Sequence, residues 1–251
     1  MSRLSPDTVR LHVGLHGYAL RVDSARHEFV WSAPLSAHDG RTLCAALDAL
    51  NLAGSDGCKR LEVSLGNAWI RYQLVRYPKN VSSREERNAF LKAVFFEVYG
   101  AEAESFHIIA EPGTLGLPVL ACALNAAFLQ SIQQVAARHK LKLHSVRGAF
   151  VSRFNSLRPH LSGDCGAFAD VDEGRVNMGV WLKGEWCLLR SQPFLANAGN
   201  TLGSMLSQML ATNPAAAIGG KLHVMNQPAD AQPLLPQGWS LIYLPKDVEC
   251  A

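Results

Sequence analysis

Residues 166–193 read GAFADVDEGRVNMGVWLKGEWCLLRSQP. Three runs of apolar or alternating residues are separated by two turns that each contain a glycine, at 172–175 and 183–185. Short alternating runs joined by such turns predict a three-stranded antiparallel meander. A meander of this kind can open one half of a nucleotide-binding fold, in which its first turn holds phosphate. It can also support the fold and hold no ligand.

The first half of the chain follows the same plan as this stretch and the residues after it. In each half we expect a meander, then a helix, then at least one strand. Outside 166–193, these elements are the strands 9–15, 18–22, 28–33 and 61–65 with the helix 38–50, and the strands 222–225 and 239–244 with the helix 197–210. The two sequences are not alike, so the repeat is one of architecture. Mixed sheets with helices packed on them predict an α/β class with two lobes.

Between the two repeats lies the clearest helix signal of the chain, SSREERNAFLKAVFFEVY at 82–99. Ser82 and Ser83 each precede a glutamate by three residues, which is a doubled capping-box signature, and Gly100 ends the helix. Around it we expect strands over 67–78, 106–110, 119–124 and 141–146, a helix over 125–139 and another that ends at about 157, and a connector at 158–164.

Composition and charge argue against a nucleic-acid or membrane-spanning protein. Lys and Arg number 24 against 21 Asp and Glu, and the basic residues are scattered. Within the uncharged region 112–137 only Val119–Leu124 is continuously apolar, far short of the roughly 20 residues that a spanning helix needs. The 6 cysteines occur singly and no secretory leader is visible, so we expect a reducing, cytoplasmic location.

Three stretches carry a resemblance to a known family: LEVSLGNAWIRYQLVRYP (61–78), the helix 82–99, and VLACALNAAFLQSIQQVAARHKLKLHSVRGAF (119–150). Together with the repeated layout, they resemble the PilM and GspL cytoplasmic-domain family. These are actin-like proteins of bacterial type IV pilus and type II secretion assembly, within the actin, hexokinase and Hsp70-like superfamily. The resemblance extends over most of residues 10–195.

The resemblance implies a two-lobed actin-like fold, a duplicated ribonuclease H-like unit with mixed sheets flanked by helices. The first lobe would span 1–158 and hold a small inserted subdomain at about 79–118, and the second lobe would span 159–251. The implied partners are proteins of an inner-membrane assembly complex.

A working nucleotide site in this superfamily would need backbone N–H groups that hold phosphate and a carboxylate that holds magnesium or its water. The first meander offers Gly14 and Gly17 without a carboxylate in the turn, and the second offers Asp170, Asp172 and Gly174. An unneutralised carboxylate about 4 Å from a phosphate is destabilising by several kcal/mol. We therefore expect no bound triphosphate and no other cofactor. The turn at Asp172 supports the fold or is simply solvated.

No other catalytic or metal-binding constellation is present in the sequence. There is no Gly-x-Ser-x-Gly elbow, no phosphate-binding G-x-x-x-x-G-K-[S/T] loop and no G-x-G-x-x-G that opens a helix. His12 and His16 fall in a strand pattern without a third ligand nearby, so we expect no metal site.

Large aromatic residues form the remaining candidate site. They lie on the predicted strand 67–78 and on the capped helix, and are Trp69, Tyr72, Tyr77, Phe90, Phe96 and Tyr99. One helix face cannot bury all of its aromatic residues unless the helix is broadly covered. These residues are therefore either core or a docking patch for a peptide or partner domain.

The leading hypothesis is a non-catalytic actin-like cytoplasmic scaffold of a bacterial type IV pilus or type II secretion-like assembly. It would bind the tail of a membrane protein, or a partner ATPase, and reach the membrane through that partner. The alternative is a functional ATPase or small-molecule kinase that holds ATP and Mg²⁺ through the glycines and aspartates of the two turns. A third interpretation is an unrelated two-domain α/β protein that shares the layout by chance.

Overall fold

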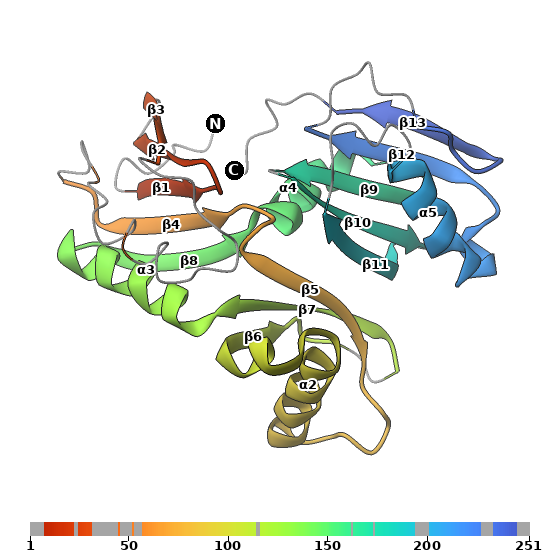
Figure 1. Ribbon diagram of the computed structural model, residues 1–251, viewed down its shortest axis with the longest axis horizontal. Helices are drawn as coiled ribbons and strands as arrows, with labels where there is room; N and C mark the ends of the chain where they lie inside the picture. The colour runs from red at the N-terminus through yellow and green to blue at the C-terminus, as the bar shows by residue number, and fades with distance from the viewer. Residues whose placement is uncertain are drawn as a thin grey trace.

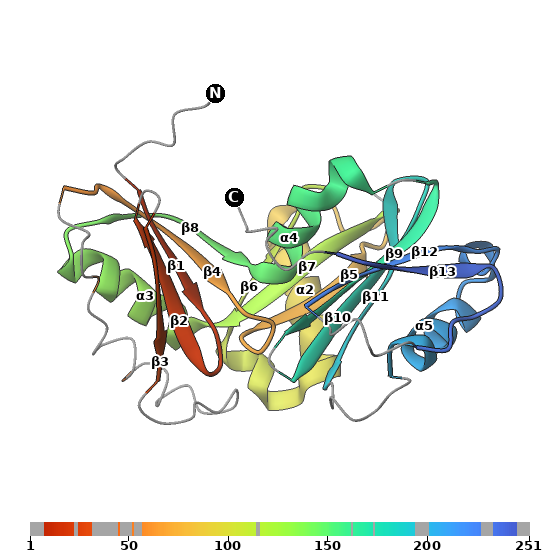
Figure 2. The ribbon, with the colours of Figure 1, turned by 90° about the horizontal axis from the view of Figure 1, so that it is seen from above.

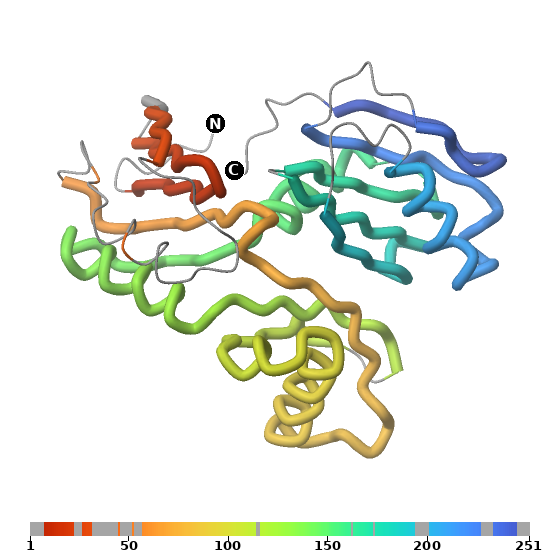
Figure 3. Tube along the Cα trace, viewed as in Figure 1, coloured from red at the N-terminus to blue at the C-terminus, as the bar shows by residue number. Residues whose placement is uncertain are grey.

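Figure 1 shows the computed structural model of the chain, which describes residues 8–22, 25–31, 45, 52, 57–113, 116–161, 163–172, 174–193, 201–226 and 233–244. Two five-stranded sheets and one three-stranded sheet form the framework of these residues. The chain leaves the first sheet for the three-stranded sheet, returns to the first, and then crosses to the second (Figure 3). Most of the helix expected over 38–50 lies outside the described residues.

The first sheet has the strand order β3-β2-β1-β4-β8. Its strands are β1 (Thr8–Val13), β2 (Gly17–Val22), β3 (Ala25–Val30), β4 (Arg60–Leu65) and β8 (Lys142–Gly148). The first three form the predicted antiparallel meander, whereas β4 and β8 run parallel to β1. Alternate residues of β1 and β4 are buried, as the period of a half-covered strand requires.

The second sheet repeats this topology strand for strand. Its strands are β9 (Cys165–Asp172), β10 (Arg175–Leu182), β11 (Glu185–Pro193), β12 (Gly220–Met225) and β13 (Trp239–Tyr243), in the order β11-β10-β9-β12-β13. The meander predicted from residues 166–193 is confirmed, and β12 and β13 run parallel to β9. The two sheets therefore confirm the α/β class and the duplicated architecture.

The third sheet lies beside the first and carries a helix on one face. It is built from β5 (Ile70–Arg76), β7 (Pro118–Asn125) and β6 (Phe106–Ala110), in that order across the sheet. The helix α2 (Arg84–Tyr99) and the short 3-10 helix η1 (Gly100–Ser105) follow β5. Leu91 and Phe95 of α2 are buried against this face of the sheet.

The N-terminus of α2 forms a single capping box. The Ser83 hydroxyl accepts a hydrogen bond from the Glu86 N–H at 3.1 Å, and the Glu86 carboxylate accepts from the Ser83 N–H at 3.0 Å. The Ser82 N–H donates to the same carboxylate at 2.9 Å. Ser82 therefore does not form the second box that the doubled signature predicted, and the helix begins at Arg84.

Helix α3 (Ala126–Arg138) covers the first sheet. The Asn125 side chain caps it by accepting a hydrogen bond from the Ala127 N–H at 2.9 Å. The residues predicted to point inward, Phe128, Ile132 and Val135, are buried in the core. The helical periodicity was thus sufficient to define the buried face of α3.

The two faces of the second sheet are covered by different helices. One face bears Ala167 and Ala169 and packs on α5 (Thr201–Ala211). The opposite face packs on α4 (Ala149–Leu157), which lies between the first and second sheets in both views (Figures 1 and 2). None of the described helices combines the length and apolar character needed to cross a membrane.

Two tryptophans of the second sheet fill spaces that glycines leave open. A Cβ atom on Gly166 would lie 2.2 Å from the Trp181 ring, and one on Gly179 would lie 2.2 Å from the Trp186 ring. Trp186 packs in turn on Phe154 of α4, with ring centroids 4.2 Å apart. The glycines therefore allow the tryptophan rings to connect the sheet to α4.

The Gly179→Ala substitution is expected to lower the free energy of unfolding by about 1–3 kcal/mol, since the packed Trp186 ring must shift to admit the methyl group. Urea denaturation measures this loss. In a Trp186→Phe background the clashing ring system is smaller, so the same substitution is expected to be less destabilising. An equal loss in both backgrounds would contradict this account of the packing.

Candidate functional site

Asp170 lies on β9 where the second sheet faces the rest of the molecule. Because Ala167, Ala169 and Val171 point toward α5, Phe168 and Asp170 point the other way. The Asp170 side chain is fully buried, at 0% exposure. A carboxylate in this position must find partners within the protein, because burying an unpaired charge is strongly unfavourable.

Three side chains from different elements supply those partners. Arg153 of α4 donates from Nη1 to Oδ1 and Oδ2 of Asp170, at 2.9 and 2.8 Å. Asn67, which follows β4, donates from Nδ2 to Oδ2 at 3.1 Å, and Asn226, which follows β12, donates to Oδ1 at 3.0 Å. We refer to Asn67, Arg153, Asp170, Asp172 and Asn226 as the Asp170 network.

Both oxygens of Asp170 are thereby saturated. Each oxygen has two donors within hydrogen-bond distance, and Nη1 of Arg153 is shared between the two oxygens. Burial raises the pKa of Asp170, the positive charge of Arg153 lowers it, and the neighbouring Asp172 raises it. A metal ion or a metal-bound water could contact this carboxylate only by displacing one of its present partners.

Asp172 also belongs to the network and does not form a solvated turn, contrary to that interpretation of the sequence. Its Oδ2 accepts from the Asn67 N–H and from Arg153 Nη1, both at 3.4 Å, and its side chain is 14% exposed. Gly174 makes the turn that follows, with φ of 77°. Glu173, between Asp172 and Gly174 in the sequence, lies outside the described residues.

The first hairpin turn is closed by its own hydrogen bonds. The Gly14 N–H donates to the Gly17 carbonyl at 2.9 Å, and the Trp31 indole N–H donates to the Gly14 carbonyl at 3.2 Å. A Cβ atom on Gly17 would lie 2.1 Å from the Phe29 carbonyl oxygen, so close strand packing requires this glycine. The Gly14 amide, one of the backbone amides that the nucleotide hypothesis assigns to phosphate, is thus already engaged.

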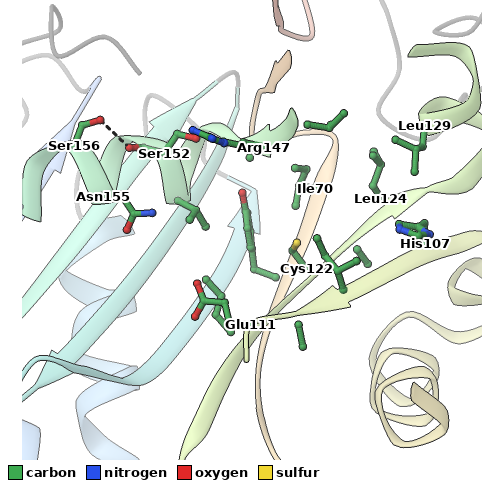
Figure 4. Close-up of a pocket in the computed structure, with 18 residues that line it drawn as sticks. Ile70, His107, Glu111, Cys122, Leu124, Leu129, Arg147, Ser152, Asn155 and Ser156 are labelled. Atoms are coloured by element: carbon green, nitrogen blue, oxygen red, sulfur yellow. Dashed lines mark hydrogen bonds between the residues drawn. The ribbon is translucent and has the colours of Figure 1, made fainter. Parts of the chain in front are cut away.

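A separate cavity of about 590 Å³ opens on the face of the third sheet that α2 leaves uncovered (Figure 4). Its wall on the sheet is mainly apolar, and its other wall comes from β8 and α4. The sheet residues include Ile70, Tyr72, His107, Ile109, Glu111, Leu120, Cys122 and Leu124, and the opposite wall includes Val146, Arg147, Val151, Ser152, Asn155 and Ser156. The alternation of β6 explains this division, since Phe106 and Ile108 pack toward α2 instead.

The cavity has an apolar floor and polar groups at its sides. Burial raises the pKa of the Cys122 thiol to about 11 and also raises the pKa of the Glu111 carboxyl. The Tyr72 hydroxyl is buried beside the backbone of Val151 and lacks a hydrogen bond of good geometry. Ile109 is 51% exposed at the edge strand β6. An amphipathic ligand can meet both kinds of surface here.

The six aromatic residues of the predicted docking patch do not form one surface. Trp69 and Tyr72 are buried, and Tyr72 is the member of this group that lines the cavity. Tyr77, Phe90 and Tyr99 pack against the core between α2 and the third sheet. Phe96 is 50% exposed on α2. Sequence reasoning did not single out Asn67, Arg153 or Asn226, which no local motif marks.

No model of a known protein family matches the chain, and no curated protein matches its sequence. Solved structures do match. A Bacteroides thetaiotaomicron protein with an actin-like ATPase fold and unknown function has a TM-score of 0.55, with 10% identity over 92% of this chain and 86% of that one.

Two further solved structures are of assembly proteins. A chain of the PilM-PilN type IV pilus biogenesis complex has a TM-score of 0.57, with 9% identity over 87% of this chain and 81% of that one. The cytoplasmic domain of EpsL, an inner-membrane component of the Vibrio cholerae type II secretion system, has a TM-score of 0.54, with 10% identity over 95% and 88%. This protein therefore has an actin-like fold, and the resemblance to PilM and GspL proteins is confirmed at the level of the fold.

The Asp170→Ala substitution is expected to lower the free energy of unfolding by roughly 3–5 kcal/mol, because it leaves the poorly exposed Arg153 guanidinium without its main partner. Chemical denaturation measures the loss. Adding Arg153→Met removes the orphaned charge and is expected to restore part of the stability. Glu185→Ala, at an exposed turn, serves as the matched control. A loss at Asp170 no larger than at Glu185 would show that the network is energetically unimportant.

Proposed function

We propose that this protein is a non-catalytic actin-like scaffold that binds a segment of a partner protein in the cavity of the third sheet. The cavity is the observation that carries the proposal, since it joins an apolar sheet face to polar groups on α4. The partner would be the cytoplasmic tail of a membrane protein, or an ATPase, of a bacterial type IV pilus or type II secretion-like assembly. The protein would then act in the cytoplasm and reach the membrane through this partner.

The cavity has features that suit an extended peptide. Apolar side chains at alternate positions of such a peptide would rest on Leu120, Cys122 and Leu124 of β7. β6 lies at the edge of the third sheet, and a sheet edge can accept an added strand through main-chain hydrogen bonds. Ser152, Asn155 and Ser156 on the opposite wall supply polar contacts (Figure 4).

The solved structures support the choice of assembly. Matches to the PilM-PilN complex and to the EpsL cytoplasmic domain have TM-scores of 0.57 and 0.54. The first is part of a pilus biogenesis complex and the second is an inner-membrane component of a secretion system. Because a shared fold does not by itself define a function, the scaffold role rests on the cavity and on the Asp170 network of this chain.

The second candidate function is an ATPase or small-molecule kinase, with ATP and Mg²⁺ held at Gly14, Gly17, Asp170, Asp172 and Gly174. The two aspartates beside a glycine turn favour it. The saturation of Asp170 and the internal hydrogen bond of Gly14 count against it. We therefore place nucleotide binding second.

A photo-crosslinking amino acid at position 109, introduced into the protein in its native host, is expected to capture a peptide of one membrane or assembly protein, identified by mass spectrometry. Position 96 is the matched control, because Ile109 and Phe96 are 51% and 50% exposed but lie on opposite sides of the third sheet. The captured segment, made as a synthetic peptide, is expected to bind at least tenfold more weakly to Ile109→Glu than to Phe96→Glu. Crosslinks at 96 alone, or equal binding by both variants, would refute this docking site.

A further inference from the structure

Helix α4 belongs to the cavity and to the Asp170 network at the same time. Its residues Val151, Ser152, Asn155 and Ser156 line the cavity. Its residues Phe150, Arg153, Phe154 and Leu157 point to the other side, where three are buried and Arg153 binds Asp170. This division follows the 3.6-residue period, which places residues three and four apart on one face. Any displacement of α4 therefore alters both sites.

The network side of α4 is held by a continuous series of contacts. Phe150 packs on Phe168 with ring centroids 5.5 Å apart, and Phe168 is two residues before Asp170 on the same strand face. Phe154 packs on Trp186 at 4.2 Å. Arg153 adds charged contacts to this series, a short ion pair with Asp170 at 2.8 Å and a longer one with Asp172 at 3.4 Å. These contacts fix the helix more specifically than the apolar rings, because each hydrogen bond demands a direction.

Tyr72 links the same helix to the opposite wall of the cavity. Its ring packs on Phe150 with centroids 5.5 Å apart, and its hydroxyl fills the space above Gly148, where a Cβ atom would lie 1.7 Å away. Gly148 is the N-cap of α4 and makes no side-chain capping bond. The position of α4 thus depends on its neighbours and not on a strong cap of its own. Tyr72, Phe150, Phe168 and Asp170 form an unbroken packed path from the cavity to the network.

We propose that the Asp170 network controls the cavity through α4, so that breaking the pair between Arg153 and Asp170 loosens the cavity wall although neither residue lines it. The cavity is formed while Arg153 is bound to Asp170. A partner that fills the cavity therefore binds the form of the protein in which this pair is intact. By thermodynamic reciprocity, the partner then strengthens the network as much as the network strengthens its binding. The effect on the partner rests on the proposed function, whereas the coupling of network and cavity does not.

Cys122 provides a probe of the cavity that needs no partner. Its thiol lines the cavity, and burial raises its pKa to about 11, so it reacts slowly with thiol reagents in the native protein. The small uncharged reagent methyl methanethiosulfonate labels it, and peptide mass spectrometry gives its rate separately from those of other cysteines. Cys165 and Cys187, both half-buried in the second sheet, report any general loosening of the fold.

The variants are Arg153→Gln, Asp170→Asn and the two combined, with Arg190→Gln as the matched control. Arg190 makes an exposed contact with Gln208, away from α4. We expect the Cys122 rate to rise at least threefold in both single variants and no further in the double variant, because both changes break one pair. The labelling rates of Cys165 and Cys187 in the network variants are expected to stay within twofold of the wild type. The labelling rate of Cys122 in Arg190→Gln is expected to do the same.

Unchanged Cys122 labelling in folded network variants would overturn the coupling, and so would an equal rise at all three cysteines. If Asp170→Asn fails to fold, Arg153→Lys replaces it, since lysine keeps the charge but cannot reproduce the guanidinium contacts.

The captured peptide is then titrated into the same variants and is expected to bind five- to tenfold more weakly. Raised Cys122 labelling without any peptide binding would refute the proposed function and leave the coupling intact. Full peptide affinity with unchanged Cys122 labelling would refute the coupling alone.

Discussion

The buried ion pair between Arg153 and Asp170 is the interaction on which the arrangement of this protein depends. A carboxylate with no exposed surface is tolerated only when charge and hydrogen bonds surround it, and here four hydrogen bonds do so. Those bonds come from Arg153 of α4, from Asn67 two residues after β4, and from Asn226 directly after β12. The need of the buried Asp170 carboxylate for polar partners therefore fixes the positions of the two repeated sheets and of α4 relative to one another.

The same requirement bears on what the protein binds. The actin-like fold brings the hairpin turns of two equivalent sheets into one molecule, but the acceptors of Asp170 and the amide of Gly14 are engaged by protein groups. A ligand would have to compete with partners that are already in place. The third sheet offers the opposite situation, because α2 covers one of its faces and the other opens into a cavity of about 590 Å³. Binding by way of that cavity suits a scaffold better than an enzyme, as we propose.

Local patterns in the sequence predicted the elements well and the site poorly. The meander at 166–193, the capping box at Ser83 and the inward face of α3 depend on neighbours within a few residues, so periodicity and capping chemistry revealed them. The partners of Asp170 lie 103, 17 and 56 residues away, at Asn67, Arg153 and Asn226, and they meet only through tertiary packing. The aromatic residues could not be assigned to core or to a docking patch for a related reason, because their spacing defines a face without showing what covers it.

Isothermal titration of Mg-ATP into the intact protein tests most directly whether Asp170 is committed to its protein partners. Our account predicts no saturable heat up to millimolar nucleotide, and no rise in thermal stability, whereas a ligand at a hundred times its Kd would add about 2.7 kcal/mol to the folded state. Saturable binding in the micromolar range that is abolished by Asp170→Asn would contradict it. Such a result would show that nucleotide and metal displace Arg153 and the two asparagines from the carboxylate.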